Sequence, residues 1–178
     1  NLPLQEQIGL LVQILQALAY VHRRGLLHRD LKPSNVLVRD RHAYVLDFGL
    51  AKDRDVHGPE ADTVGTLAYI APEVLKGEPA SEPSDLYAVG VIAYEMIAGR
   101  HPFRLDNISH LITDIIERPP DLTSLDVSEP LRLVLARLLA KDPADRYASA
   151  ADTINALCAA SGLPVPPETA ELRESYLQ

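Results

Sequence analysis

The strongest constraint on the fold is the segment 84–98, whose apolar side chains fall on every face of a helix. Ser84 is a favourable N-cap, and Asp85 in the first turn places a carboxylate at the positive end of the helix dipole. A helix that is apolar all round is buried all round. Its longest apolar run, Leu86 to Tyr94, is too short to span a bilayer, so we expect no membrane segment in this chain. The other elements must therefore pack around this helix.

The rest of the chain predicts further helices and one small β element. Apolar periodicity indicates helices over four segments, 4–24, 107–117, 130–140 and 148–160. Short β-prone runs at 36–38 and 43–46 flank a polar turn, so they predict two small strands. The expected fold class is therefore mainly α with a minor sheet, built around the buried helix.

Two segments lack a regular pattern. Residues 49–70 contain scattered glycines and acids and predict a long loop, which in a compact domain is usually functional or disordered. From residue 161 onward Gly162 and several prolines interrupt the helical pattern, with a possible restart at 168–177. We expect one domain over residues 1–160, followed by a linker or tail over 161–178.

Composition narrows the class of protein and its compartment. The net charge of −8 argues against a nucleic-acid partner or an anionic membrane surface. The single cysteine, Cys158, excludes a disulfide within the chain and favours a cytoplasmic location. Residue 1 is Asn and the only methionine is Met96, so we expect the sequence to be part of a larger protein. Four of the six histidines, His42, His57, His101 and His110, are interpreted as solvated or capping residues.

A dense polar stretch, HRDLKPSN at 28–35, lies between apolar segments. Within it Asp30, Lys32 and Asn35 supply a carboxylate, an ammonium group and an amide oxygen on one loop. Phosphoryl transfer needs such a set: a proton acceptor for a hydroxyl, a positive charge on the moving group and an oxygen ligand for Mg²⁺. Asp47, which follows the second predicted strand, is placed to supply a further hard ligand for the metal.

Three motifs then stand in order along the chain. They are His28-Arg29-Asp30 with Asn35, then Asp47-Phe48-Gly49, then Ala71-Pro72-Glu73. This ordered set resembles the signature series of eukaryotic-type protein kinases, although any one motif alone would mean little. Lys32, two residues after Asp30, and the segment 65–73 resemble serine/threonine kinases rather than tyrosine kinases, and the segment 84–103 most resembles bacterial members.

The resemblance implies a role for each residue of the site. Asp30 would accept the proton of the substrate hydroxyl, and Lys32 would steady the γ-phosphate of ATP. Asn35 and Asp47 would be the two Mg²⁺ ligands. Leu37 would pack beneath the adenine ring. These residues would line a cleft whose floor is formed by the neighbouring apolar residues.

The resemblance also implies supporting contacts. Thr66 would hydrogen-bond the aspartate and lysine of the catalytic loop, and Asp85 would anchor the backbone of that loop. Glu73 and Arg146 would form an ion pair that braces the far end of the long loop and is costly to break if buried.

The long loop departs from the usual pattern at one position. Arg29 beside the catalytic aspartate is typical of control by loop phosphorylation, in which the phosphate pairs with that arginine and with a basic residue, here Lys52. The usual phosphorylated position, three residues before Gly65, is Asp62. We hypothesise that Asp62 pairs with Arg29 or Lys52 in partial place of a phosphate, with Thr63 as the alternative phosphorylation site. The other interpretation is that Asp62 is a solvated loop acid.

The glycine-rich loop and strand lysine of a kinase N-terminal lobe are absent from the sequence. The resemblance thus covers a C-terminal lobe. We expect a serine/threonine kinase catalytic region that uses ATP and Mg²⁺ and has a protein Ser or Thr as substrate. Without its N-terminal lobe in cis, this chain is expected to be weakly active or inactive. One alternative is a pseudokinase-like binding or scaffold module. A small-molecule phosphotransferase of related fold is the other, but such enzymes typically lack the APE segment found at 71–73.

Overall fold

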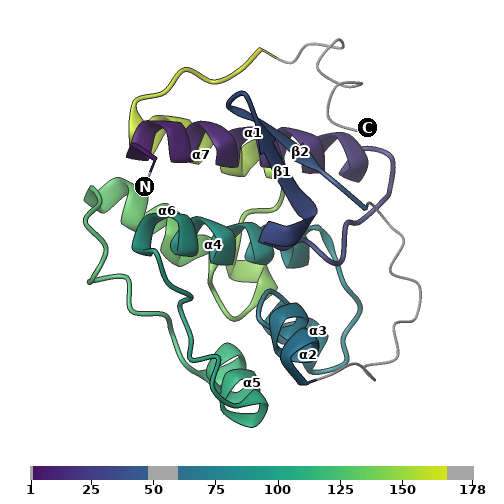
Figure 1. Ribbon diagram of the computed structural model, residues 1–178. Coiled ribbons are helices and arrows are strands. Elements are labelled where there is room, and N and C mark those ends of the chain that lie inside the picture. The colour runs from purple at the N-terminus through teal and green to yellow at the C-terminus, as the bar shows by residue number, and fades with distance from the viewer. Residues whose placement is uncertain (1, 48–59, 168–178) are drawn as a thin grey trace.

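The computed structural model describes residues 2–47 and 60–167, with the side chains of the second range described from Val64 onward (Figure 1). The helices and strands, in chain order, are α1 (Leu4–His22), η1 (Pro33–Asn35), β1 (Val36–Arg39), β2 (His42–Val45), α2 (Glu60–Leu67), α3 (Pro72–Leu75), α4 (Glu82–Ala98), α5 (Ile108–Glu117), α6 (Glu129–Leu138), η2 (Pro143–Asp145) and α7 (Ala150–Ser161). The expected fold class, mainly helical with one small β element, is confirmed.

Helix α4 runs through the middle of the molecule and packs against both α1 and α6 (Figure 1). Every residue from Ser84 to Tyr94 is buried, as the apolar pattern predicts. The prediction was wrong about the start of the helix, because the N-cap is Ser81 and not Ser84. Ser84 lies three residues later and accepts a hydrogen bond from the Ser81 amide, so the two serines form a capping box.

Gly90 allows α4 and α6 to approach closely. A Cβ atom at this position would lie 2.9 Å from Cβ of Leu138 and 3.1 Å from Cδ2 of Leu139. Both leucines are buried, so neither has space to move away. The absence of a side chain at residue 90 therefore sets the distance between these helices.

The Gly90→Ala substitution is expected to lower the free energy of unfolding by about 1–3 kcal/mol, because the added methyl group overpacks this contact. Gly9→Ala in α1 is the matched control. Apart from its chain neighbours and the backbone of its own helix, nothing lies within 4 Å of a Cβ at residue 9, so there the substitution is expected to stabilise the helix by about 0.5–1 kcal/mol. Urea unfolding of both variants measures the difference, and equal effects of the two substitutions would contradict the close-approach argument.

The two strands form an antiparallel hairpin in which Val36 pairs with Val45 and Arg39 with His42. Asp40 and Arg41 make the turn with φ of 50° and 62°, as a type I′ turn requires. Gln13 of α1 holds the hairpin, since its side-chain oxygen accepts from the Ala43 amide at 2.8 Å and its nitrogen donates to the Arg41 carbonyl at 3.2 Å. The two predicted strands are confirmed to within one residue at each end.

The predicted long loop at 49–70 is wrong in its second part, because residues 60–67 form α2. Gly65 within this segment disfavours a helix by local propensity. Val64 and Leu67 nevertheless pack against the core, and the Ala68 amide donates to the Val64 carbonyl at 3.0 Å. Tertiary packing thus overrides the weak local signal, while residues 48–59 lie outside the described part of the chain.

The ends of the other helices differ little from the prediction. Helix α1 ends at His22 rather than at residue 24, and Gly25 follows it with φ of 71°, as expected of a helix stop. Helix α7 packs along α1 and ends at Ser161, where the tail was expected to begin. The possible helix at 168–177 lies outside the described residues. Among the residues that the structure describes, none of the helices has the length and apolar character needed to cross a bilayer.

Candidate active site

The loop that carries Asp30 is held by Asp85, at the start of α4. One carboxylate oxygen of Asp85 accepts from the His28 amide at 2.8 Å, and the other accepts from the Arg29 amide at 2.9 Å. Asp85 is buried, so both bonds are shielded from water. They hold Arg29 at a φ of 67°, which is unfavourable for a residue with a side chain. The predicted anchoring of the loop by Asp85 is confirmed.

His28 connects this loop to the end of strand β2. Its Nδ1 accepts from the Asp30 amide at 3.3 Å, so the ring proton lies on Nε2, which donates to the Leu46 carbonyl at 2.9 Å. The Leu46 amide in turn donates to the Asn35 carbonyl at 2.9 Å. The segment before Asp47 is therefore fixed beside the loop that carries Asp30 and Asn35.

The polar side chains of the loop meet around Asp30. The Lys32 ammonium nitrogen lies 3.3 Å from Oδ1 of Asp30 and donates to Oγ1 of Thr66 at 3.2 Å. The Asn35 amide nitrogen donates to the Asp30 carbonyl at 2.7 Å and reaches Oδ2 of its carboxylate at 3.3 Å. Four of the predicted site residues are thus brought together, and the predicted contact between Thr66 and Lys32 is present.

Asp47 and Leu37 are the two remaining predicted site residues. Asp47 is exposed, follows β2 by two residues and has φ of 60°, while Leu37 on β1 is 52% exposed. The proposed roles of Asp47 toward Mg²⁺ and of Leu37 toward adenine stay predictions. Phe48 and Gly49 of the same motif lie outside the described residues.

The donor set fits a weakly held magnesium ion. In the described part of the chain, no group of three or more His, Cys, Asp or Glu side chains is arranged to hold a metal ion. Because the Asn35 nitrogen is turned toward Asp30, its amide oxygen is directed away from that carboxylate. Asn35 and Asp47 would therefore offer two oxygen ligands, and Mg²⁺ in phosphate-binding sites usually takes one or two protein ligands and completes its shell with phosphate and water.

A cavity of about 130 Å³ opens beside Asp30. One wall is the loop with Arg29, Asp30 and Leu31, and the facing wall is the segment from Thr66 to Ala71. Val74 and Ala88 contribute an apolar floor. The arrangement places Asp30 at the border of an open space between this loop and the segment from Thr66 to Ala71.

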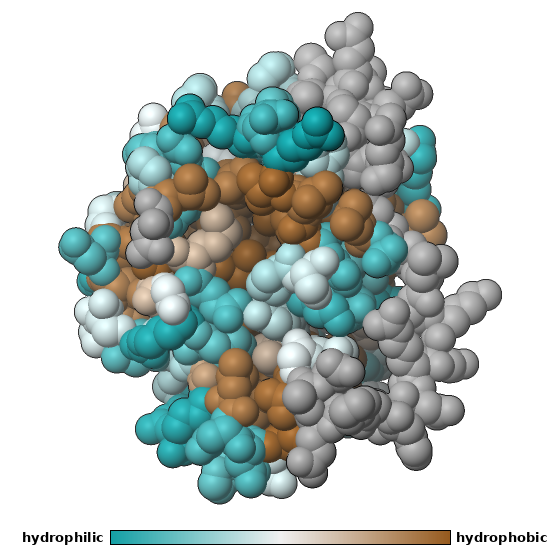
Figure 2. Space-filling model, viewed as in Figure 1, coloured by the Kyte–Doolittle hydropathy of each residue, from teal (hydrophilic) through white to brown (hydrophobic). Residues whose placement is uncertain are grey.

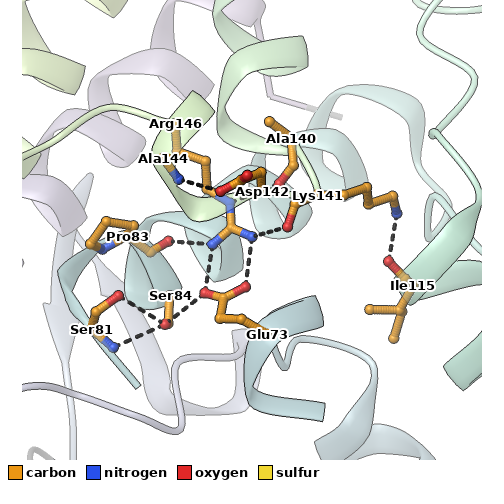
Figure 3. Close-up of polar contacts among 10 residues, drawn as sticks. All are labelled: Glu73, Ser81, Pro83, Ser84, Ile115, Ala140, Lys141, Asp142, Ala144 and Arg146. Atoms are coloured by element: carbon orange, nitrogen blue, oxygen red, sulfur yellow. Dashed lines mark hydrogen bonds and ion pairs between the residues drawn. The ribbon is translucent and has the colours of Figure 1, made fainter. Parts of the chain in front are cut away.

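Behind this cavity, Glu73 and Arg146 form a buried bidentate ion pair (Figure 3). The guanidinium group donates to the two carboxylate oxygens at 2.8 and 2.7 Å, and Ser84 donates to the first of them at 2.8 Å. The remaining donors of Arg146 reach carbonyl oxygens, those of Pro83, Ala140 and Lys141. The predicted pair is therefore confirmed, and all of its polar atoms have partners.

The directions of the pKa shifts of Glu73 and Lys141 agree with these contacts. Burial by itself disfavours the charged form of Glu73, but hydrogen bonds from Arg146 and Ser84 outweigh it, so the pKa of the carboxyl lies below its ordinary value. Lys141 next to the pair donates to the Ile115 carbonyl at 2.6 Å, near the end of α5. Burial, together with the charge of Arg146, lowers the pKa of Lys141 to about 8.

Two supporting residues were not predicted. His22 at the end of α1 lies with Nε2 2.8 Å from the Asp85 carboxylate, and Ser84 joins the start of α4 to Glu73. Neither could be found by local pattern, because their partners are distant in sequence. The hypothesis that Asp62 pairs with Arg29 or Lys52 falls outside the described side chains and stays a prediction.

Comparison with known proteins gives consistent matches. The family model described as "Protein kinase domain" matches residues 2–157. Serine/threonine-protein kinase Pkn1 of Myxococcus xanthus is 42% identical over 161 residues, which cover 84% of this chain and 23% of the relative. Serine/threonine-protein kinase PknA of Mycobacterium tuberculosis is 37% identical over 176 residues, covering 95% of this chain and 41% of the relative. The chain thus spans well under half the length of these curated relatives.

Proposed function

The chain belongs to the protein kinase family, and we propose that it is the catalytic C-terminal region of a protein serine/threonine kinase. The proposed reaction moves the γ-phosphoryl group of ATP to a Ser or Thr hydroxyl of a protein. One observation carries the proposal above all: Lys32 and Asn35 both contact the carboxylate of Asp30, and Lys32 also contacts Thr66 on the opposite wall of the cavity.

Asp30 is the proposed proton acceptor. A hydroxyl in the adjoining cavity gives its proton to the Asp30 carboxylate as its oxygen bonds to the γ-phosphorus, and the bond from that phosphorus to the bridging oxygen of ADP breaks. Lys32, 3.3 Å from Asp30, places a positive charge where negative charge develops on the transferred group. Thr66 fixes the direction of the lysine side chain by accepting its hydrogen bond.

Asn35 and Asp47 are the proposed Mg²⁺ ligands. Mg²⁺, when bound, neutralises charge on the phosphates of ATP and keeps them in line with the attacking oxygen. The hydrogen bond between the Leu46 amide and the Asn35 carbonyl supports this assignment, because it keeps the backbone before Asp47 next to Asn35. Leu37, half exposed on β1, is the proposed apolar surface under the adenine ring.

We also propose that a second lobe closes over this surface in the intact protein. The exposed fractions of Leu26, Leu37 and Val38 are 54%, 52% and 48%, high for large apolar side chains. Figure 2 shows a band of apolar residues over α1 and the hairpin. The 178 residues on their own would then bind Mg·ATP weakly, because half of the clamp around the nucleotide is not in them.

The test is transfer of labelled phosphate from γ-labelled ATP. The protein from the full reading frame is expected to phosphorylate a basic protein substrate on serine or threonine, and the 178-residue chain to transfer phosphate at a much lower rate. Acid hydrolysis and separation of the phosphoamino acids identify the acceptor. Phosphotyrosine as the main product, or no transfer by the full-length protein, would overturn the proposed function; full activity of the isolated chain would overturn the proposed second lobe.

A further inference from the structure

His101 lies in the turn between α4 and α5 and is buried, so it is not a solvated residue, and of the two predicted roles its side chain fits the capping one. Its Nδ1 accepts from the Phe103 amide at 3.1 Å, which places the ring proton on Nε2. Nε2 then donates to the Ala68 carbonyl at 3.0 Å. One nitrogen therefore organises the local turn, and the other reaches a segment that is distant in sequence.

The segment that His101 contacts faces Asp30. Ala68 comes two residues after Thr66, whose hydroxyl accepts from Lys32, and directly before Tyr69. Residues 66 and 69–71 line the cavity opposite Arg29 and Asp30. A shift of the backbone at Ala68 would therefore move the wall of the cavity and the partner of Lys32 together.

Tyr69 makes a second set of contacts that hold the same segment in place. Its ring meets that of His101 edge to face, with centroids 5.7 Å apart and planes at 86°. The Tyr69 hydroxyl donates to Glu95 of α4 at 2.6 Å. Burial, reinforced by this bond and by the negative charge of Glu95, raises the pKa of Tyr69, which keeps the hydroxyl a donor.

We propose that His101 is a positioning residue for the protein substrate: through Ala68 it fixes the segment 66–71 at the distance from Asp30 that substrate binding requires. That a protein substrate occupies the cavity rests on the proposed function. The contact between His101 and Ala68 does not depend on it. The competing explanation is that His101 matters only for the turn at Phe103, through Nδ1.

Two substitutions separate these explanations. In His101→Gln the longer side chain can place an amide nitrogen near the position of Nε2 and keep the bond to Ala68. In His101→Asn the side-chain oxygen can replace Nδ1 as acceptor for the Phe103 amide, two residues on, but does not reach Ala68. The pair thus removes one contact at a time without adding charge.

The first measurement needs no enzymatic activity. Amide hydrogen exchange is followed in the 178-residue chain at Ala68 and Ile70, whose amides donate to Val64 and Leu67. Loss of one hydrogen bond is expected to speed exchange at these amides about fivefold in His101→Asn, with wild-type exchange in His101→Gln. Equal acceleration in both variants, failure of both to fold, or no acceleration in either overturns the proposal.

The second measurement uses peptide phosphorylation by the full-length protein. His101→Asn is expected to raise KM for the peptide about fivefold while KM for ATP stays unchanged, and His101→Gln restores the peptide KM. A change in both KM values, or no rescue by Gln, overturns the positioning role. If the wild-type protein transferred no phosphate, the proposed function would be refuted. The amide hydrogen exchange of the two variants would then decide whether His101 positions the segment 66–71.

Discussion

Replacing Asp30 with Asn is expected to lower kcat for peptide phosphorylation by about 10²–10⁴-fold, because the amide cannot take up the proton of the substrate hydroxyl. The fold should persist, since the Asn side-chain oxygen can keep the contact with Lys32 and Asn35 keeps its hydrogen bond to the backbone carbonyl of residue 30. Initial rates with the full-length protein, at varied peptide and ATP concentrations, separate kcat from the two KM values.

Asp126→Asn is the matched control for this substitution. Asp126 is exposed and lies in the connection between α5 and α6, away from the site. The substitution makes the same change of charge there, so kcat of the Asp126→Asn variant should equal that of the wild type. Thermal unfolding of both variants should give wild-type midpoints. If Asp30→Asn kept more than about a tenth of the wild-type kcat, Asp30 would not be the proton acceptor.

Arg146→Met is expected to lower the free energy of unfolding by about 3–5 kcal/mol, the largest effect on stability that the structure predicts. Arg146 and Glu73 are 2% and 3% exposed, so removal of the guanidinium group leaves a buried carboxylate with Ser84 as its remaining side-chain donor. Methionine keeps much of the apolar volume of the arginine stem. Urea unfolding of the 178-residue chain at neutral pH measures the loss.

Arg39→Met gives the comparison with an exposed ion pair. The side chains of Arg39 and Asp40 are 80% and 90% exposed, with 3.6 Å between the charged atoms, so this substitution is expected to change stability by about 0.5 kcal/mol or less. Similar losses in the two variants would show that burial does not determine the contribution of the Glu73–Arg146 pair.

Acidification provides an independent check on the same pair. The folded-state pKa of Glu73 lies below its unfolded value, so the unfolded chain binds the proton more readily. The stability due to the charged carboxylate is fully present above the unfolded pKa and is lost as the pH falls through the folded pKa. The difference in unfolding free energy between wild type and Arg146→Met should therefore narrow on acidification, and a difference that stays constant would contradict the role of Glu73.

The elements and motifs that depend on neighbouring residues could be predicted from the sequence. The apolar circumference of α4, the two strands and the grouping of Asp30, Lys32 and Asn35 all follow from residues close together in the chain. The mutual contacts of the last three could be expected because a loop of this length keeps its members near one another.

Contacts between distant residues could be predicted only where the family resemblance supplied them. Nothing in the local sequence links Glu73 to Arg146, or Asp85 to the amides of His28 and Arg29. These contacts were predicted from the resemblance to protein kinases. His101 belongs to no motif, and its partner Ala68 is 33 residues away, so its burial was missed. The helix α2 was missed for a related reason, because its stability comes from packing and not from the propensity of its residues.

The burial of α4 on all sides has a consequence for biosynthesis. A ribosome makes α1 before α4 but α6 after it, and α6 supplies the surface against which Gly90 packs. A nascent chain halted between the two therefore exposes an apolar helix with part of its covering still missing. Such intermediates attract chaperones or aggregate, so stop codons placed between residues 98 and 129 should yield insoluble fragments, not smaller folded ones.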